Sequence, residues 1–203
     1  MCYSKVCSVF FKEIYLRGRL IVISGPSGVG KDCVLCEMRR LNSDTLVSVS
    51  ATTRLPRSGE VDGKDYYFFS KQDFENKIKN NEFIEYATYC GNYYGTLKFP
   101  LEKNLVSGKD VILKIEVQGA TKIRMVIPEC LSIFIVPPSI EVLKKRILTR
   151  GSNSDKEVDD RLKQVKIEMI ESSNYDYVVV NDKIDVCARK ILKIINNIGK
   201  GNL

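Results

Sequence analysis

The residues best suited to chemistry stand at positions 25–31, which read Gly-Pro-Ser-Gly-Val-Gly-Lys directly after an apolar run. This Gly-x-x-x-x-Gly-Lys pattern is typical of a phosphate-binding P-loop. Its glycines let the backbone curl until the N–H groups form a nest for an anion. The positive end of a following helix and the ammonium group of Lys31 add to that nest. The segment predicts phosphate binding, and the alternative is a glycine-rich turn that binds no ligand.

The residue after this lysine departs from the pattern. P-loop enzymes normally have Ser or Thr there, with a hydroxyl that meets Mg²⁺, whereas this chain has Asp32. We expect Asp32 to supply a carboxylate on the metal side, directly or through water.

The elements that must position these groups alternate along the chain. Apolar strands are expected at 19–24, 109–116, 131–136 and 177–181. One helix is expected from the P-loop to about Leu41, and a second begins at about Gln118 after the second strand. A third follows the strand at 131–136 and ends at Arg150, and a fourth spans 183–198. This rhythm predicts an α/β fold whose parallel sheet is covered by helices on both faces.

Two segments interrupt this alternation of strands and helices. Residues 48–97 predict a small mixed lobe, with a short helix that Ser70 opens and a hairpin after it. Residues 150–160 are polar and predict a loop between two helices, with arginines on both sides. Residues 1–18 precede the first expected strand, and we expect them to form an N-terminal extension that is not a signal peptide.

The amino-acid composition limits the classes of protein to which this chain can belong. The 203 residues, 44% hydrophobic and 28% charged, fit one globular domain with inserted lobes, and no apolar run is long enough to span a membrane. Seven cysteines and no histidine predict a reducing cytoplasm rather than a disulfide framework or a zinc site. Cys33 and Cys36 form a C-x-x-C that we interpret as two small core residues.

The chain resembles guanylate kinase over residues 19–198. The resemblance rests on the P-loop, on Ser-Val-Ser-Ala-Thr-Thr-Arg-Leu-Pro-Arg-Ser-Gly-Glu-Val-Asp-Gly-Lys-Asp-Tyr at 48–66, on residues 91–96 and 116–120, and on Arg146, Arg150 and Arg161. It implies a P-loop NTPase-type core at 19–47 and 98–203, a GMP-binding lobe at 48–97 and a lid at about 147–165. It also implies the reaction ATP + GMP → ADP + GDP with Mg²⁺.

The resemblance further implies the residues of the site. Those expected to bind ATP are Gly25, Pro26, Ser27, Gly28, Val29, Gly30, Lys31, Asp32 and Asn181. Those expected to bind GMP are Ser50, Arg54, Arg57, Tyr66, Glu85, Tyr94, Thr96 and Glu116. Those expected to act in catalysis are Lys31, Arg54, Arg146, Arg150 and Arg161.

The chemistry of these side chains agrees with the roles that the resemblance implies. Guanidinium forks bind phosphate oxygens in pairs. A carboxylate such as Glu85 accepts from the N1–H and the exocyclic amine of guanine, a pair of donors that adenine lacks. Arginines on a lid stabilise the charge of the transferring phosphoryl group on closure. Asn181 matches an asparagine near the adenine.

The net charge of +7 could indicate either a surface that binds nucleic acid or arginines that gather around small anionic ligands. Five arginines fall on phosphate positions and no long basic run exists, so we expect nucleotides as partners, neither nucleic acid nor membrane, and a monomer or homodimer. The alternatives are a non-catalytic binding module of this fold and a kinase of another nucleoside monophosphate.

Asp32 and Lys114 look like an exchange of charge across one site. In the family, position 32 commonly has a small or hydroxyl residue and position 114 an acidic one. We expect Asp32 to face the metal while Lys114 pairs with it or with phosphate, and Glu116 stays available to the metal or to guanine. The alternatives are two tolerated substitutions, or a Lys114 that repels Mg²⁺.

Overall fold

The computed structural model describes residues 18–89, 91–149 and 155–198. The predictions for the N-terminal extension before residue 18 and for Arg150 lie outside the described residues. Within the described part, no helix combines the length and the apolar character that crossing a bilayer requires.

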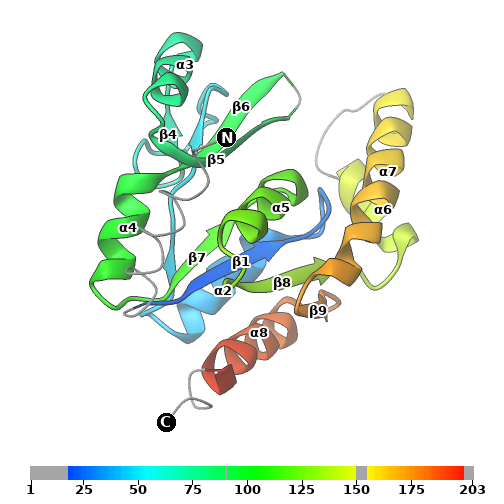
Figure 1. Cartoon of the computed structure of the whole chain (residues 1–203). Coiled ribbons are helices and arrows are strands. Elements are labelled where there is room, and N and C mark those ends of the chain that lie inside the picture. The colour runs from blue at the N-terminus through cyan, green and yellow to red at the C-terminus, as the bar shows by residue number, and fades with distance from the viewer. Residues whose placement is uncertain (1–17, 90, 150–154, 199–203) are drawn as a thin grey trace. The chain divides into compact units, whose positions relative to one another are not determined.

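Strands and helices alternate as the apolar runs predict (Figure 1). In chain order the elements are β1 Leu20–Ser24, α2 Lys31–Leu41, β2 Leu46–Val47, β3 Ala51–Thr52, β4 Tyr67–Phe68, α3 Lys71–Lys79, β5 Phe83–Tyr89, β6 Asn92–Leu97, α4 Lys98–Val106, β7 Val111–Lys114, α5 Val117–Val126, β8 Leu131–Val136, α6 Ile140–Thr149, α7 Asp155–Ile170, a 3-10 turn Glu171–Asn174, β9 Tyr177–Val180 and α8 Ile184–Ile198.

The larger sheet confirms the predicted fold class. Its five strands run in the order β2-β7-β1-β8-β9, and its pairs β2–β7 and β8–β9 are parallel. Every residue of β1 is buried, which explains its continuous apolar run. The molecule is therefore an α/β protein with a parallel sheet flanked by helices.

The chain divides into two compact units. The first contains the residues up to Val22 together with Leu46–Leu131, and the second contains Ile23–Thr45 together with the residues from Ser132 onward. Strand β1 contributes residues to both.

The first unit contains the predicted small lobe, a four-stranded sheet in the order β4-β3-β6-β5. Helix α3 packs Phe74 against Phe83 and Tyr93, with ring centroids 4.3 and 5.2 Å apart. As expected, Ser70 caps this helix, and its side chain accepts a hydrogen bond from the backbone N–H of Asp73. The capped helix therefore fixes one face of the hairpin as a small apolar core.

A bulge gives the hairpin a second, polar face. Phe83 pairs with Leu97, but the register shifts before the next pair, Glu85 with Thr96. Phe83 packs in the core beside α3, whereas Glu85 shares its face with Thr96, because the extra residue interrupts the alternation. Tyr94 lies two residues from Thr96 and belongs to that same face. The bulge thus turns Glu85 away from the core of the lobe.

The second unit contradicts the prediction of a polar loop between its helices. Residues 155–160, expected in a polar loop, begin helix α7. The reason is the spacing of Leu162, Val165 and Met169, which suits one helical face. Leu162, Val165 and Met169 pack in a cluster with Leu143 and Ile147 of α6, which lies beside α7 (Figure 1).

The interpretation of Cys33 and Cys36 as core residues is wrong. Both are free and exposed on α2. The buried face of this helix consists of Lys31, Val34, Leu35 and Met38. The helical period of about 3.6 residues turns positions 33 and 36 away from that face.

Candidate functional site

The loop between β1 and α2 has a backbone that only glycine tolerates easily. Gly25 and Gly30 have φ angles of 152° and 97°. A Cβ atom would lie 2.3 Å from the carbonyl oxygen of Ile135 at Gly25, and 2.8 Å from Asn181 Nδ2 at Gly30. These positions therefore combine an unusual backbone with a close approach, as a curled phosphate-binding loop requires.

Lys31 begins helix α2 and is buried at its base, with 9% of its surface exposed. Its Nζ donates to the carbonyl oxygen of Gly25 at 2.6 Å, so the ammonium group is held over the loop. The N-cap residue Gly30 offers no side-chain acceptor to the first turn. A positive helix end and a buried cation thus share one site, as the sequence predicts. Asp32 is the next residue and is exposed in the first turn.

Asn181 and Arg146, which come from elements farther along the chain, both donate hydrogen bonds to the same loop. Asn181 is buried at the end of β9, and its Nδ2 donates to the carbonyl oxygen of Val29 at 2.8 Å. Arg146 of α6 donates from both terminal nitrogens to the carbonyl oxygen of Asn181, each at 3.1 Å. Asn181 Oδ1 is buried and has no hydrogen-bond partner among the described residues. An acceptor is thus held ready beside the loop.

Sequence reasoning missed Glu168 of α7. Its carboxylate is buried, with 6% of the residue exposed. Oε2 accepts from the backbone N–H of Ser27 at 3.4 Å, and Oε1 accepts from Gln164 Nε2 at 3.2 Å. The available signal was its spacing: Glu168 lies seven residues, about two turns, after the half-buried Arg161. Glu168 therefore connects α7 to the P-loop.

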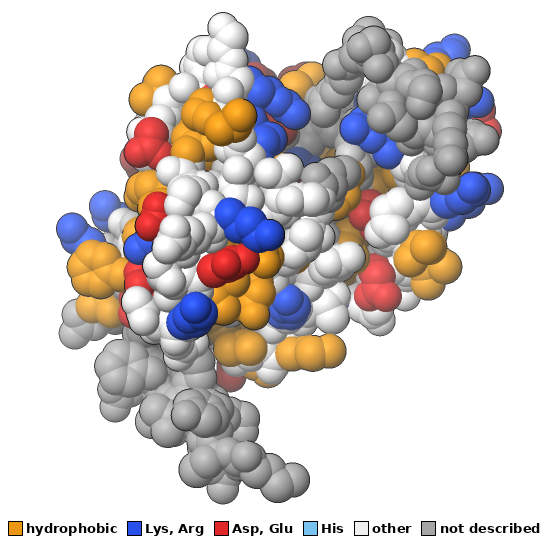
Figure 2. Space-filling model, turned by 90° about the horizontal axis from the view of Figure 1, so that it is seen from above, with side chains coloured by type: hydrophobic (Ala, Val, Ile, Leu, Met, Phe, Trp, Pro, Cys, Tyr) orange, Lys and Arg blue, Asp and Glu red, His pale blue; other side chains and the backbone are white. Residues whose placement is uncertain are grey.

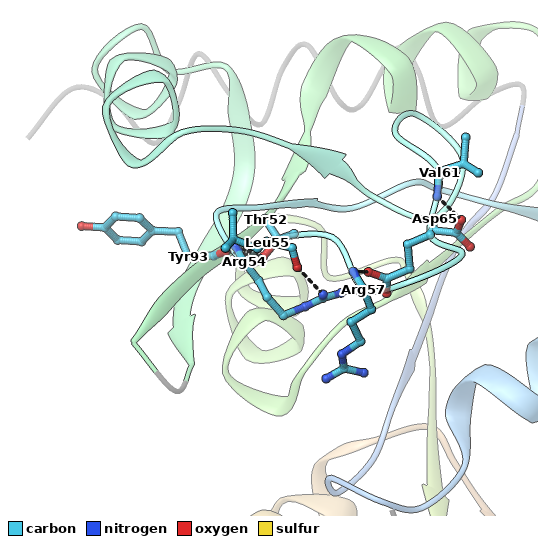
Figure 3. Close-up of polar contacts among 8 residues, drawn as sticks. Thr52, Arg54, Leu55, Arg57, Val61, Asp65 and Tyr93 are labelled. Atoms are coloured by element: carbon cyan, nitrogen blue, oxygen red, sulfur yellow. Dashed lines mark hydrogen bonds and ion pairs between the residues drawn. The ribbon is translucent and has the colours of Figure 1, made fainter. Parts of the chain in front are cut away.

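In the first unit, Arg54 is held in a defined orientation. Its NH2 group forms an ion pair with Glu60 Oε1 at 2.8 Å, and its NH1 group donates to the carbonyl oxygen of Leu55 at 2.6 Å (Figure 3). The hydrogen bond to Glu60 raises the pKa of Arg54 above its ordinary value. Arg57 is anchored differently, through its backbone N–H to Glu60 Oε2 at 2.7 Å. Its side chain is exposed and extends away from the loop in Figure 3.

Arg54, Lys114 and Tyr94 all contact the ring of Tyr66. The Arg54 guanidinium carbon lies 5.4 Å from the centroid of the Tyr66 ring, and Lys114 Nζ lies 5.3 Å from that centroid. The rings of Tyr66 and Tyr94 meet edge to face at 6.2 Å. The structure thus brings together cations and phenol groups from segments far apart in sequence, a suitable arrangement for a phosphate monoester.

Glu85 is buried on the polar face of the hairpin. It is 6% exposed, and its Oε1 accepts a hydrogen bond from the Thr96 hydroxyl at 2.8 Å. Burial raises the pKa of Glu85 to about 7, while the Thr96 hydrogen bond and the charge of Lys122 act in the opposite direction. A buried acceptor that titrates near neutral pH is typical of a functional carboxylate.

Two further residues predicted to bind GMP lie next to β3 and α5. Ser50 is half-buried, and its carbonyl oxygen accepts from the backbone N–H of Tyr67 at 2.9 Å. Glu116 is half-buried and is the N-cap residue of α5.

Charged groups on the face in Figure 2 are dispersed. Lys and Arg side chains lie there among acidic, apolar and neutral ones. In the parts of the chain that the structure describes, no three Cys, Asp or Glu residues gather as ligands for a metal ion.

The comparisons with known proteins agree in their description. A family model described as guanylate kinase matches residues 17–198. The chain is 50% identical to a guanylate kinase of Clostridium tetani, over 89% of this chain and 86% of that protein. It is 47% identical to the Lactococcus lactis guanylate kinase, over 88% and 87%. A crystal structure of guanylate kinase from Anaplasma phagocytophilum is 35% identical, with a TM-score of 0.75 over 92% of this chain and 88% of that one.

Proposed function

The chain belongs to the guanylate kinase family, and we propose here the residues with which it transfers a phosphoryl group from ATP to GMP. The protein is an ATP-dependent guanylate kinase that yields ADP and GDP. One observation carries the residue assignment: the buried Glu85–Thr96 pair on the polar face of the lobe, an acceptor suited to guanine.

The ATP side of the site consists of the P-loop and Asn181. Backbone N–H groups of the loop at 25–31, in which Pro26 has none, and the Lys31 ammonium group bind the phosphates. The unpartnered Oδ1 of Asn181 supports a contact with the base, because the exocyclic amine of adenine would satisfy a buried acceptor. Glu168 orders the loop from α7 through Ser27.

Family members generally require a divalent metal with ATP, and we propose Mg²⁺. The donor chemistry fits: Asp32 places an exposed carboxylate in the first turn after Lys31, and Mg²⁺ commonly takes one or two carboxylates with phosphate and water. Asp32 would hold the ion directly or through water. When bound, the ion would neutralise part of the phosphate charge.

The GMP side divides into a phosphate clamp and a base pocket. Arg54, Arg57, Tyr66 and Tyr94 bind the phosphate, supported by the packing of Arg54 and Tyr94 around Tyr66. Ser50, Glu85 and Thr96 bind guanine, and Glu116 borders that pocket. The ionised Glu85 accepts from N1–H and the 2-amino group, whereas adenine would place an acceptor against it.

Transfer needs no covalent intermediate on the protein. A phosphate oxygen of GMP attacks the γ-phosphorus of ATP in line, and the bond to the ADP oxygen breaks. Lys31, Arg54, Arg146, Arg150 and Arg161 provide positive charge around the transferring group. The contacts of Arg146 with the loop that contains Val29 support its place there.

The same proposal covers organisation and context. Residues 19–47 and 98–203 form the core, 48–97 the GMP lobe and about 147–165 the lid, after an extension at 1–18. The enzyme acts in the cytoplasm on free nucleotides, without nucleic acid or membrane, as a monomer or homodimer.

A coupled ADP-release assay tests the function. With ATP and Mg²⁺, GMP should be phosphorylated at least a hundredfold more efficiently than AMP, UMP or CMP. Lys31→Ala should abolish turnover while exposed Lys79→Ala retains it. Equal use of AMP would favour a kinase of another nucleoside monophosphate, and binding without turnover would favour a non-catalytic module.

A further inference from the structure

The Glu85 carboxylate is confined on two sides by different elements. Thr96 on β6 donates its hydroxyl to Oε1 at 2.8 Å. On the other side lies Gly119, a buried residue in the first turn of α5. A Cβ atom at Gly119 would lie 2.6 Å from Glu85 Oε2 and 3.2 Å from Cδ. The first distance is far inside the contact distance of about 3.5 Å, so Oε2 occupies the space that any side chain would fill.

The backbone itself gives no reason for glycine at this position. Gly119 is helical and is not among the residues with positive φ. Glycine is less favourable than alanine in a helix, so the helix itself does not call for it. The other atom near the added Cβ, Ile115 Cβ, would lie at an ordinary distance of 3.7 Å. The close approach of Glu85 is therefore the feature that a side chain at 119 would disturb.

The orientation of the carboxylate decides what it can recognise. To accept two adjacent donors of one base, both oxygens must face that base in one plane. Thr96 fixes one oxygen, and the space above Gly119 sets the direction of the other. A methyl group at 119 would force Oε2 to rotate away or the carboxylate to withdraw.

We propose that Gly119 is a positioning residue for guanine selection, which acts by leaving room for Glu85 to present both carboxylate oxygens to the base. The inference rests on the proposed role of Glu85 in binding GMP. It predicts that selectivity for the 2-amino group depends on a residue that carries no side chain.

GMP and IMP give a sharp test, because IMP has the same phosphate, ribose and N1–H but lacks the 2-amino group. In wild-type protein, kcat/KM should favour GMP strongly. Gly119→Ala should lower the GMP:IMP ratio of kcat/KM at least tenfold and raise KM for GMP, while KM for ATP changes less than twofold. The neighbouring exposed Gln118→Ala is the matched control and should retain the wild-type ratio.

A double-mutant cycle identifies the route of the effect. If Gly119 acts through Glu85, Gly119→Ala should lower the ratio little further in a Glu85→Gln background. Thermal unfolding should show Gly119→Ala folded, as its helical backbone allows. If that variant does not fold, Glu85→Asp provides the second background: the shorter side chain withdraws from the methyl group, and Gly119→Ala should then cost no further selectivity.

The outcomes separate this inference from the function on which it rests. A wild-type GMP:IMP ratio in Gly119→Ala, together with a lowered ratio in Glu85→Gln, would overturn the role of Gly119 and leave Glu85 as the guanine residue. Unchanged ratios in both variants would overturn the assignment of Glu85 itself. A further tenfold loss in either Glu85 background would show that Gly119 acts by another route and would also overturn the inference.

Discussion

At the scale of single residues, burial gives Glu85 a charge state that changes near neutral pH. Its raised pKa of about 7 means that the free lobe holds a substantial fraction of neutral carboxyl at physiological pH. The neutral form presents a hydroxyl donor toward the donors of guanine, whereas the ionised form accepts from both. Binding of GMP should therefore release a proton from Glu85 below pH 7.

This linkage predicts the pH dependence of the KM for GMP. As pH falls from 8 to 6, KM should rise, and the slope should approach about tenfold per pH unit below the pKa. Glu85→Gln removes the titrating group and retains the dependence that the GMP phosphate itself causes. Steady-state kinetics of both proteins across this range provide the measurement. Superimposable profiles of KM against pH would contradict the prediction.

Asp32 and Lys114 support a second prediction at this scale. Lys114 Nζ lies over the Tyr66 ring, and Asp32 belongs to the other unit, so their exchange of charge stays a hypothesis. Lys114→Asp should lower the Mg²⁺ concentration for half-maximal activity about tenfold, because under this hypothesis two carboxylates would then serve the metal. Adding Asp32→Ser should restore it. Coupling above about 1 kcal/mol in Mg²⁺ titrations is expected, and simple additivity of the two changes would contradict the exchange.

At the scale of elements, the cap of helix α3 stabilises the lobe to which we assign the guanine pocket. Ser70 accepts from the backbone N–H of Asp73 at 3.1 Å, and its hydroxyl donates to the Asp73 carboxylate at 2.6 Å. Ser70→Ala should lower the free energy of unfolding by about 1 kcal/mol, because one end group of the helix loses its acceptor. Urea denaturation measures the change. Exposed Ser43→Ala is the control, and an equal effect in both variants would show that the cap contributes nothing.

At the scale of the whole molecule, the proposed substrate residues divide between the two units. Every described residue assigned to GMP lies in the first unit, and those assigned to ATP lie in the second. In-line transfer requires the two phosphates to meet. Each nucleotide alone therefore contacts proposed residues of one unit, and only the two nucleotides together contact proposed residues of both units.

We expect GMP together with a non-hydrolysable ATP analogue to reduce the radius of gyration more than either nucleotide alone. Arginines brought to the phosphates by both units would stabilise the compact arrangement. X-ray scattering with each ligand and with both provides the measurement, and Lys31→Ala is the control because it weakens the ATP side. Identical scattering curves under all conditions would contradict closure.

The sequence alone determined the features that depend on local pattern. The P-loop is contiguous, and its glycines and Lys31 form their site through backbone geometry within seven residues. The parallel sheet follows from buried apolar strands alternating with helices, and Ser70 caps α3 through a contact over three residues. Such features are predictable because their causes lie within a few residues of their effects.

Only the tertiary structure decided which faces and distant partners these residues have. Alternation along β5 would place Glu85 on the side of Phe83, but a bulge against β6 turns it to the face of Thr96. Gly119 matters through an approach to Glu85, and Glu168 through a contact with Ser27, 141 positions away in the chain. These relations arise when strand register and helix packing bring separate segments together, and no local pattern encodes that distance.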